Sequence, residues 1–569
     1  MRSIKYLTCL FLIFLSLNVY AQLSTNEKPI SFSMKLDTSE GKTSTIRTIT
    51  TPVLDMAKIE AEDKEDEKYD MPPRFGYPHK VNYDLINSGT WYTLPNGDKL
   101  WQLNVICPNA LSVNFSYDKF WIPEGGKFFV YSKDKKHSIG AFTSRNNKGS
   151  REQPRGFATG LVYGDNVMLE YYQPKEATSD AIISLKYIIH GYKYINIGEK
   201  NLGSSGSCQV NVNCEEGQDW QKEKKAVAMI LVGNHRLCTG ALINTTSLSK
   251  EPLFLTANHC IDSYGDATED ADLDDFSFYW NYEAPGCANV SVEPTYFSTD
   301  GATILANNSI SDFALLRLTE DPQELSNYTP YYLGWDSSGQ SGHPEACIHH
   351  PSGDVKKISK VDSLSVKSTY YSLYTESESG NHWKVTWRVT PNGHGTTEGG
   401  SSGSPLLNAT HKVIGQLHGG YANCGDSISA PDWYGKFDVS WTGNGNSSIY
   451  RRLNCWLNSI NSETQTLEGL LIIPTIQVIN TDQQLYCNIR ITSSGQLTVQ
   501  SDVEFSGNCK IIVEAGGKLI VDSGALLNVD IVLYSGASLQ IINDGIIETI
   551  NGLDASLGAT VDIIEGAIN

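Results

Sequence analysis

Three short segments in the middle of this 569-residue chain contain the residue types needed for nucleophilic catalysis. The segments are LFLTANHC (253 to 260), SDFALLRL (311 to 318) and GGSSGSPL (399 to 406). They carry His259, Asp312 and Ser402 at strand ends or in a glycine-rich turn. Any one of these residues alone has an ordinary structural explanation, such as a strand cap or a neighbour of a disulfide. In this order, and within one β-rich region, they predict a general base, the carboxylate that orients it, and a nucleophile.

The demands of acyl transfer account for each residue type. A serine hydroxyl is nearly inert at neutral pH, so Ser402 needs an imidazole within hydrogen-bond reach that accepts its proton during attack. The other ring nitrogen of His259 must donate to a buried carboxylate, and Asp312 suits this role because an apolar strand follows it. We expect the backbone N–H groups of Gly400 and Ser402 to stabilise the oxyanion, each contributing roughly a hundred-fold to a thousand-fold in rate.

This region resembles the trypsin-like serine peptidases, and most closely the bacterial lysyl endopeptidases. The motifs that carry the resemblance are SGSC (205 to 208), CTGALIN (238 to 244), FLTANHC (254 to 260), YWNY (279 to 282), SDFALLRL, IHHP (348 to 351), TEGGSSGSP (397 to 405), GQLHGG (415 to 420), DWYGKF (432 to 437) and SWTGNG (440 to 445). The resemblance implies a chymotrypsin-like double β-barrel. A less distinctive similarity relates residues 75 to 195 to the propeptides of such enzymes.

Eleven cysteines remain after Cys9, which lies in the leader segment described below. The family resemblance implies three disulfides: Cys208 to Cys424, Cys214 to Cys287, and Cys238 to Cys260. Sequence alone cannot choose among the fifteen pairings of six cysteines. Of the other cysteines, Cys107 is the expected unpaired one. Proximity suggests Cys487 to Cys509, which leaves Cys347 to Cys455 by elimination.

The specificity pocket departs from that of trypsin itself. In that enzyme the acid that binds a basic side chain lies six residues before the nucleophile, and Thr396 occupies this position here. A buried lysine ammonium without a counter-charge is costly, so another acid is needed. The resemblance assigns this role to Asp432, with Glu398 as a second carboxylate at the pocket wall. The alternatives are a loop carboxylate after a proline for Asp432 and a solvated loop residue for Glu398.

Further residues near the site are assigned by the resemblance alone. His418 matches a histidine that stands next to the triad aspartate under an aromatic ring, and Tyr374 is the candidate for that ring. A hydrogen-bonded core histidine is the alternative interpretation of His418. Ser401 replaces the aspartate that pairs with a new N-terminal amine in most trypsin-like zymogens, so activation must work differently. We interpret His349 and His350 as structural and expect no metal or cofactor.

The flanking segments indicate an exported, multidomain chain. Residues 1 to 21 have a basic start, an apolar run and a small residue at Ala21, which is typical of a secretory signal peptide, with a membrane anchor as the alternative. Residues 22 to 200 form a predicted propeptide, polar at first and rich in β-strand patterns from about residue 75. The predicted protease domain spans 201 to 462 and closes on a terminal helix at 448 to 460.

The last hundred residues follow a different pattern. Units of the form Gly-x-Leu/Val-x-Val/Ile begin at Gly495, Gly517, Gly536 and Gly558. A period near 20 with alternating apolar positions predicts a β-solenoid over 463 to 569, with a β-sandwich as the alternative. The whole chain is therefore predicted to be mainly β, with a β-sandwich-like propeptide, a double β-barrel protease and a C-terminal β-solenoid-like domain.

These features lead to a functional expectation. We expect a secreted serine endopeptidase that cuts after lysine through an acyl-enzyme, acting on proteins or peptides. Its own propeptide should block the cleft until the enzyme cuts between Lys200 and Asn201. The alternatives are cleavage after Arg or after both basic residues, or an inactive surface adhesin or binding protein on the same fold. A separate expectation is attachment to the cell surface through the C-terminal domain. The net charge of −20, without any basic block, argues against nucleic acid as a partner.

Overall fold

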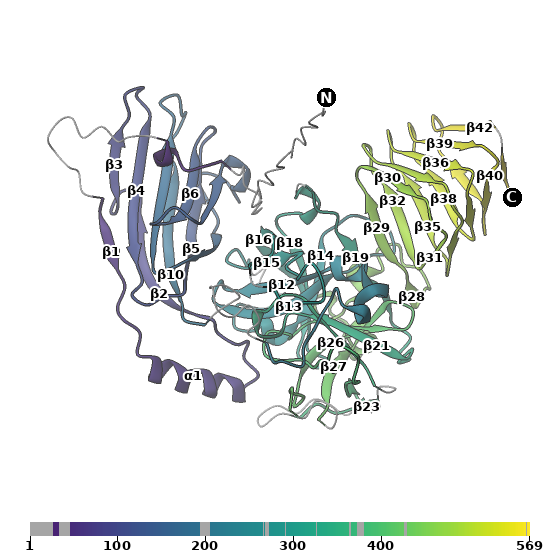
Figure 1. The fold of residues 1–569 in the computed structure, drawn as a ribbon, viewed down its shortest axis with the longest axis horizontal. Helices are drawn as coiled ribbons and strands as arrows, with labels where there is room; N and C mark the ends of the chain where they lie inside the picture. Colours follow the sequence, from purple (N-terminus) through teal and green to yellow (C-terminus); the bar gives the residue numbers. More distant parts are fainter. Residues whose placement is uncertain are drawn as a thin grey trace, which may run out of the picture.

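The computed structural model describes most of the chain in three bodies. The described residues are 27–33, 46–193, 205–265, 267, 272–290, 292–325, 327–362, 366–371, 380–425, 430–564 and 566–569. The predicted signal peptide, the cleavage pair Lys200 and Asn201, and Tyr374 lie outside them. Figure 1 shows an N-terminal β domain, a central β body and a C-terminal stack of strands, in chain order. The prediction of a mainly β chain is confirmed.

The N-terminal domain is a pair of sheets around its own core. One sheet contains β1 (Thr48–Thr50), β3 (Thr90–Thr93), β4 (Lys99–Ile106), β6 (Lys127–Ser132), β7 (Ser138–Phe142) and β9 (Asn166–Gln173). The other contains β2 (Gly76–Asp84), β5 (Ser112–Trp121), β8 (Phe157–Tyr163) and β10 (Ile182–Gly191). Alternate residues of both sheets, among them Trp101, Phe115 and Leu185, fill one buried cluster between them. This agrees with the sandwich-like propeptide that the sequence predicts.

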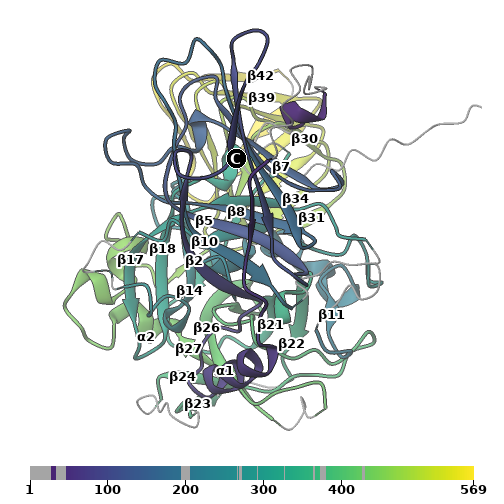
Figure 2. The ribbon, with the colours of Figure 1, turned by 90° about the vertical axis from the view of Figure 1, so that its left-hand side faces the viewer.

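Structure begins earlier in this region than the sequence predicted. The polar stretch before residue 75 contains β1 and the helix α1 (Met56–Lys68). Asp55 caps the helix by accepting a hydrogen bond from the backbone N–H of Lys58, and only Ile59 is buried. Few apolar residues mark α1 in the sequence, because ion pairs rather than an apolar face attach it. Figure 2 shows α1 at the lower end of the N-terminal sheets.

The central body contains two mainly antiparallel sheets. The first has the order β16 (Phe297–Asp300), β15 (Ser277–Trp280), β12 (Val227–Val232), β13 (Arg236–Leu242), β14 (Leu253–Ala257), β18 (Phe313–Leu318) and β17 (Ala302–Asn308). The second has the order β11 (Val210–Asn211), β22 (Lys357–Lys360), β21 (Pro344–His349), β25 (Pro405–Asn408), β26 (Lys412–Gly420), β27 (Asp432–Lys436), β24 (His382–Val385) and β23 (Val366–Ser368). The short strands β20 (Gly334–Asp336) and β28 (Thr466–Leu467) extend it.

The predicted terminal helix is reduced to short pieces. Residues 448–460 contain the 3-10 turn η9 (Ile449–Arg451) and the single turn α3 (Asn454–Leu457). An earlier helix, α2 (Phe437–Thr442), ends at Gly443, whose φ is 62°. Leu453 and Leu457 are both buried, and the N–H of Leu453 donates to the carbonyl of Ser440. Tertiary contacts of these leucines therefore override the helical pattern of the segment.

The C-terminal region is a solenoid with three parallel faces, and the sandwich alternative is excluded. The first face contains β29 (Gly469–Ile473), β32 (Cys487–Ile491), β35 (Lys510–Val513), β38 (Asp530–Leu533) and β41 (Leu553–Ala555). The second contains β30 (Ile476–Ile479), β33 (Gln496–Val499), β36 (Lys518–Asp522), β39 (Ser538–Ile542) and β42 (Thr560–Ile563). The third contains β31 (Gln483–Leu485), β34 (Val503–Phe505), β37 (Ala525–Leu527), β40 (Gly545–Glu548) and β43 (Gly566–Ile568). Leu497, Leu519, Leu539 and Val561 stack in register, as the glycine-led repeat predicts.

Three disulfides form with the pairing that the resemblance implies: Cys208 to Cys424, Cys214 to Cys287, and Cys238 to Cys260. Cys107 is free, as expected. The other two pairings are wrong, because Cys347, Cys455, Cys487 and Cys509 are all unbonded. Cys347 is buried beside the hydroxyl of Ser404, whereas Cys455 is exposed on α3. Cys487 and Cys509 both face the solenoid interior, where each packs as a small apolar core residue. Pairing cysteines by their proximity in the sequence could not detect this.

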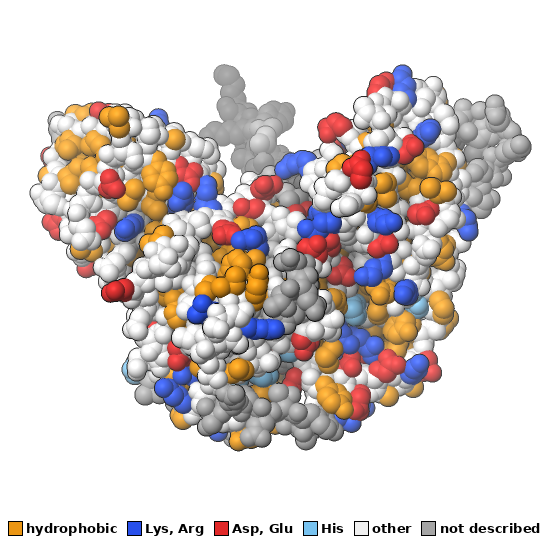
Figure 3. All heavy atoms as spheres, turned by 180° about the vertical axis from the view of Figure 1, so that it is seen from behind, with side chains coloured by type: hydrophobic (Ala, Val, Ile, Leu, Met, Phe, Trp, Pro, Cys, Tyr) orange, Lys and Arg blue, Asp and Glu red, His pale blue; other side chains and the backbone are white. Residues whose placement is uncertain are grey.

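The outer surface is polar and mixed in charge. Figure 3 shows Lys and Arg interspersed with Asp and Glu on one face, and two lobes that rise on either side of the central body. Among the helices of the described residues, none has the length and apolar character that a membrane span requires.

Candidate active site

His259 and Asp312 form a buried pair at the ends of two neighbouring strands. β14 and β18 are antiparallel neighbours, and η5 (Asn258–Cys260) follows β14 directly, so His259 arrives beside Asp312. The Nδ1 atom of His259 lies 2.7 Å from Oδ2 of Asp312, and the backbone N–H of His259 donates to Oδ1 at 2.9 Å. Both carboxylate oxygens thus hold one histidine, and the Nδ1 contact leaves its Nε2 atom as the nitrogen for other partners.

The two pKa values move in the directions that a catalytic pair requires. Burial acts to lower the pKa of His259, but the charge and hydrogen bond of Asp312 outweigh burial and hold this pKa above its usual value. Burial acts to raise the pKa of Asp312, but His259, His418 and the hydrogen bonds keep it below its usual value. Asp312 therefore stays ionised and stabilises an imidazolium at His259.

The turn that carries Ser402 lies against the histidine segment. The backbone N–H of Thr239 on β13 donates to the carbonyl of Ser402 at 2.8 Å, and this carbonyl lies 3.8 Å from the sulfur of Cys260. The neighbouring Gly403 has a φ of 83°, and a side chain there would collide with Thr256 and Thr239. Among the described residues the Ser402 hydroxyl has no hydrogen bond to His259. Such bonds are often long before substrate is bound.

The loop expected to stabilise the oxyanion has an ordered backbone. Gly400 has a φ of 97°, and its carbonyl accepts a hydrogen bond from the hydroxyl of Thr239 at 2.8 Å. Within the described part of the chain, neither the N–H of Gly400 nor that of Ser402 donates to a protein acceptor, so both are available to an oxyanion. The buried Ser401 hydroxyl lies 2.8 Å from Nδ1 of His349. This contact, which sequence reasoning missed, anchors the loop without the ion pair that Ser401 cannot make.

His418 belongs to the site, and a different tyrosine covers it. Its Nε2 atom lies 3.8 Å from Oδ2 of Asp312, and its ring is nearly parallel to that of His259 at 5.7 Å. The ring stacked on His418 is Tyr370, with centroids 3.9 Å apart, four residues before the predicted Tyr374. On its other side, Nδ1 of His418 lies 2.9 Å from Nε2 of His382. No sequence signal singled out Tyr370 or His382.

Asp432 is a buried acid held by neutral donors. It begins β27, and 1% of it is exposed. Its Oδ2 atom accepts hydrogen bonds from the Thr397 hydroxyl at 2.6 Å and the Trp387 indole at 2.8 Å, and its Oδ1 atom accepts one from the N–H of Ala422. Burial raises the pKa of Asp432 to about 6, although these hydrogen bonds act to lower it. Asp432 is thus an anion without a cationic partner among the described residues, which is the property of a receptor for a cation.

Glu398 is engaged elsewhere. Its Oε1 atom accepts hydrogen bonds from the N–H of Gly206 at 2.9 Å and from the side chain of Gln209 at 2.8 Å. Its Oε2 atom accepts one from the hydroxyl of Ser352 at 2.8 Å. These contacts fasten the first residues of the protease region beside the Cys208 disulfide. The expected role of Glu398 at the pocket wall stays a prediction, and its contacts here are structural.

An unforeseen element crosses the site from the N-terminal domain. The N–H of Leu237 donates to the carbonyl of Pro73 at 3.1 Å, and Arg74 bridges to Arg236 in antiparallel fashion. A Cβ placed on Gly399 would lie 3.2 Å from Pro73. Three residues earlier, the carboxylate of Asp70 accepts a hydrogen bond from the Tyr370 hydroxyl at 3.1 Å.

Among the residues that the structure describes, two groups of side chains have metal-ligating atoms within 4.8 Å of one another. In Cys238, His259 and Cys260, both cysteines are committed to a disulfide. In the other group, His259 and His418 both direct nitrogen atoms at Asp312, as described above. Neither group presents a set of free ligands to an ion.

Comparison with known proteins finds similarity over the central region. A sequence model of the family described as "Lysyl endopeptidase, C-terminal domain" matches residues 202–435. This region is similar to lysyl endopeptidases. A lysyl endopeptidase of Pseudomonas aeruginosa is 31% identical over 249 residues, which cover 41% of this chain and 49% of the relative. The chain therefore spans about half the length of that relative.

Solved structures that are similar to part of the chain include two endopeptidases. A Glu endopeptidase is 18% identical and covers 41% of this chain and 92% of its own, with a TM-score of 0.24. A serine endoprotease from Yersinia pestis is 13% identical and covers 41% of this chain and 65% of its own, with a TM-score of 0.25.

Proposed function

We propose that the protein is a secreted serine endopeptidase that hydrolyses the peptide bond on the carboxyl side of lysine, and that it is made as a self-processing zymogen. The observation that carries this proposal is the position of the His259–Asp312 pair beside the Ser402 turn, with the buried carboxylate of Asp432 on β27, in the sheet whose strand β25 follows that turn. The match of residues 202–435 to the lysyl endopeptidase family and the three disulfides support it.

The chemistry follows from the positions of the side chains. His259 Nε2 accepts the proton of the Ser402 hydroxyl as its oxygen attacks the scissile carbonyl carbon. The N–H groups of Gly400 and Ser402 stabilise the oxyanion, while Asp312 stabilises the imidazolium. His259 then donates the proton to the leaving amine. Water, activated by the same histidine, hydrolyses the acyl-enzyme and releases Ser402.

Lysine specificity rests on the environment of Asp432. Its donors among the described residues are a hydroxyl, an indole and backbone N–H groups, and none of these is a cation. A lysine ammonium that reaches this carboxylate gains a partner, whereas a neutral side chain leaves the buried charge uncompensated. An arginine could also supply the charge, which makes cleavage after both basic residues the alternative outcome.

Zymogen inhibition is supported by the contacts of residues 70–74. This segment passes from Tyr370, which covers His418, to the nucleophile turn at Gly399 and the start of β13. Because the loop expected to stabilise the oxyanion has an ordered backbone, the block is one of access rather than of an unformed site. Pro72 and Pro73 lack backbone N–H groups and restrict the backbone of this segment. Residues 70–74 contain no lysine, so the segment lies against the nucleophile turn without presenting a peptide bond that follows lysine.

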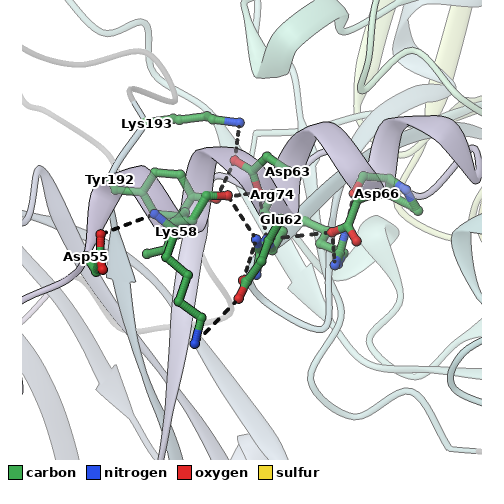
Figure 4. Close-up of polar contacts among 11 residues, drawn as sticks. Asp55, Lys58, Glu62, Asp63, Asp66, Arg74, Tyr192 and Lys193 are labelled. Carbon is green, nitrogen blue, oxygen red and sulfur yellow. Dashed lines mark hydrogen bonds and ion pairs between the residues drawn. The ribbon is translucent and has the colours of Figure 1, made fainter.

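Helix α1 fastens this segment through ion pairs, as Figure 4 shows. Arg74 Nε lies 2.8 Å from Asp63 Oδ1, and its Nη2 atom lies 3.1 Å from Glu62 Oε2. Lys193 Nζ also reaches Asp63 at 2.8 Å, and Arg236 of β13 pairs with Asp66 at 2.7 Å. The end of the propeptide thus contacts the same helix that holds the blocking segment.

Active-site labelling and N-terminal sequencing test the proposal. Wild-type protein should react with a fluorophosphonate at Ser402 after maturation and should begin at Asn201, whereas Ser402→Ala should keep its propeptide and react with no probe. A mature start at Asn201 in Ser402→Ala would exclude self-cleavage. A matured wild-type protein that takes up no label would favour the inactive adhesin.

A reporter panel with Lys, Arg and neutral residues at the cleavage position tests specificity. Asp432→Asn is nearly the same size as the native residue and should lower kcat/KM for Lys reporters by about a hundred-fold or more, since it leaves the ammonium unpaired. Fluorophosphonate labelling of Ser402 should change little. Equal losses for neutral and Lys reporters would contradict the assignment of Asp432.

A further inference from the structure

We propose that His382 is a positioning residue that fixes the tautomer of His418, so that His418 presents an N–H rather than a lone pair to the carboxylate of Asp312. The inference rests on the proposed function, because it assigns a role within the same catalytic machinery. It concerns a residue on β24, a strand that carries none of the catalytic groups.

The geometry forms a chain of four groups. His382 Nε2 lies 2.9 Å from His418 Nδ1, and His418 Nε2 lies 3.8 Å from Asp312 Oδ2. Asp312 in turn holds His259 at 2.7 Å. The ring of Tyr370 packs against both His418 and His382, with centroids 3.9 and 5.7 Å apart, so neither imidazole can turn freely.

His382 and His418 are both neutral in this environment. His382 is fully buried, and burial lowers its pKa to about 3. Burial also lowers the pKa of His418, although the charge of Asp312 opposes this effect. Each ring therefore carries one N–H, and their mutual hydrogen bond requires one ring to donate and the other to accept.

An orphaned atom decides the direction of this hydrogen bond. Within the described residues, Nδ1 of His382 is buried and has no hydrogen-bond partner. If His418 donated to His382, the proton of His382 would sit on this orphaned nitrogen, and a lone pair of His418 would face the Asp312 carboxylate. Both features are unfavourable. In the other arrangement His382 Nε2–H donates to His418 Nδ1, and His418 Nε2–H points at Asp312.

This arrangement has a consequence for His259. A donor dipole from His418 stabilises the negative charge on Asp312 and so weakens the hold of Asp312 on a proton at His259. The other charged groups that face His259 are Asp262, which follows it in the chain, and Asp70 of the propeptide, which is absent after maturation. Loss of the dipole should raise the pKa of His259.

The first test is the pH profile of three variants, each made as the full chain and matured with a trace of wild-type enzyme. His382→Phe should lower kcat/KM several-fold at neutral pH and move the acid limb to higher pH by a few tenths of a unit. His382→Gln keeps an amide donor near the same place and should restore the limb. In a His418→Phe background, His382→Phe should move the limb no further. A shift of equal size in that background, or no shift in His382→Phe, would overturn the inference.

The second test needs neither activity nor maturation. In the full-length Ser402→Ala protein with nitrogen-15 histidine, the Nδ1 atoms of His382 and His418 should both give signals of unprotonated ring nitrogens. A protonated Nδ1 at either residue would overturn the inference. The two hypotheses can be tested separately. Matured wild-type protein that takes up no fluorophosphonate at Ser402 would contradict the proposed function. Labelled wild-type protein together with the opposite tautomer of His382 or His418 would contradict only the role of His382.

Discussion

The two β domains that flank the protease region are attached to it in different ways. The N-terminal domain has a core of its own and meets the protease through polar contacts, such as Arg155 with Asp274, and a small apolar cluster around Phe75. The solenoid instead shares one continuous core with the protease. Its strand β29 pairs with β19 (Tyr331–Tyr332), and Glu468 holds both Asn244 and Lys412.

This difference indicates which flank can separate from the protease as a folded unit. The N-terminal domain keeps its own core and contacts the protease through ion pairs and one apolar cluster, whereas the shared core of the solenoid resembles that of a single domain. The proposed propeptide would have to dissociate after cleavage, and a separate core is compatible with this. The solenoid is attached as a permanent part of the folded unit, so loss of the tail after residue 462 should cost the protease its fold.

The largest effect is expected from removing the solenoid. A chain that ends at residue 462 exposes Tyr331 and Tyr332, which are both fully buried, so we expect insoluble or unfolded protease. In the control, residues 201–569 are expressed as one chain and the proposed propeptide is supplied as a separate chain. We expect residues 201–569 to fold under these conditions. Soluble yield and thermal unfolding are the measurements. A truncated protein that melts at the temperature of the full chain would show that the protease does not depend on the core that it shares with the solenoid.

A single side chain at the solenoid junction should have a smaller effect. Tyr331→Ala leaves a cavity between the protease and β29 and should lower the free energy of unfolding by about 3–5 kcal/mol. Tyr331→Phe is the matched control, because in the described residues the Tyr331 hydroxyl is buried without a hydrogen-bond partner, and its loss should be nearly neutral. Denaturant titration of both variants measures the difference. Equal losses would mean that packing is not the cause.

Propeptide binding should depend on pH through Glu293. Its Oε1 atom accepts a hydrogen bond from the Tyr163 hydroxyl of the N-terminal domain, the proposed propeptide, and burial raises its pKa to about 8. A solvated Glu293 ionises near 4.5, so the bound state retains a proton that the free state has lost. Affinity should be greatest below pH 4.5 and fall by about tenfold or more as pH rises to 8. Calorimetry with Ser402→Ala protease should find this dependence absent in Glu293→Gln.

The smallest effect is expected from one propeptide ion pair. Arg155 donates two hydrogen bonds to Asp274, at 3.1 and 2.8 Å, and is partly exposed. A double-mutant cycle with Arg155→Ala and Asp274→Ala should yield a coupling of about 1 kcal/mol in propeptide binding, or roughly fivefold in affinity. Additive effects of the two substitutions would show that the pair contributes nothing to attachment.

Much of the fold was predictable because its signals are local. The stacked glycine-led units predict the solenoid, since each coil repeats the same apolar positions against its neighbours. The motifs around His259, Asp312 and Ser402 predict the candidate site because strand ends and glycine-rich turns have recognisable patterns in short stretches of sequence. The helix α1 left none, because it has a single buried residue, Ile59.

The rest depends on contacts between residues far apart in the chain. His382 resembles any buried strand residue until its neighbour His418 is known, and Tyr370 is one of several tyrosines in a segment without a strong pattern. Asp70 lies 300 positions from its partner Tyr370. Cys487 and Cys509 were paired by proximity alone, although burial in an apolar interior explains them equally well.

The burial of Asp432 has a consequence for the proposed lysine specificity. With a pKa of about 6, this carboxylate takes up a proton in mildly acidic surroundings. If Asp432 receives the substrate ammonium, as we propose, a proton and that ammonium compete for the same carboxylate. Acid would then act as a competitive antagonist of the substrate, and its effect would disappear as the medium turns neutral.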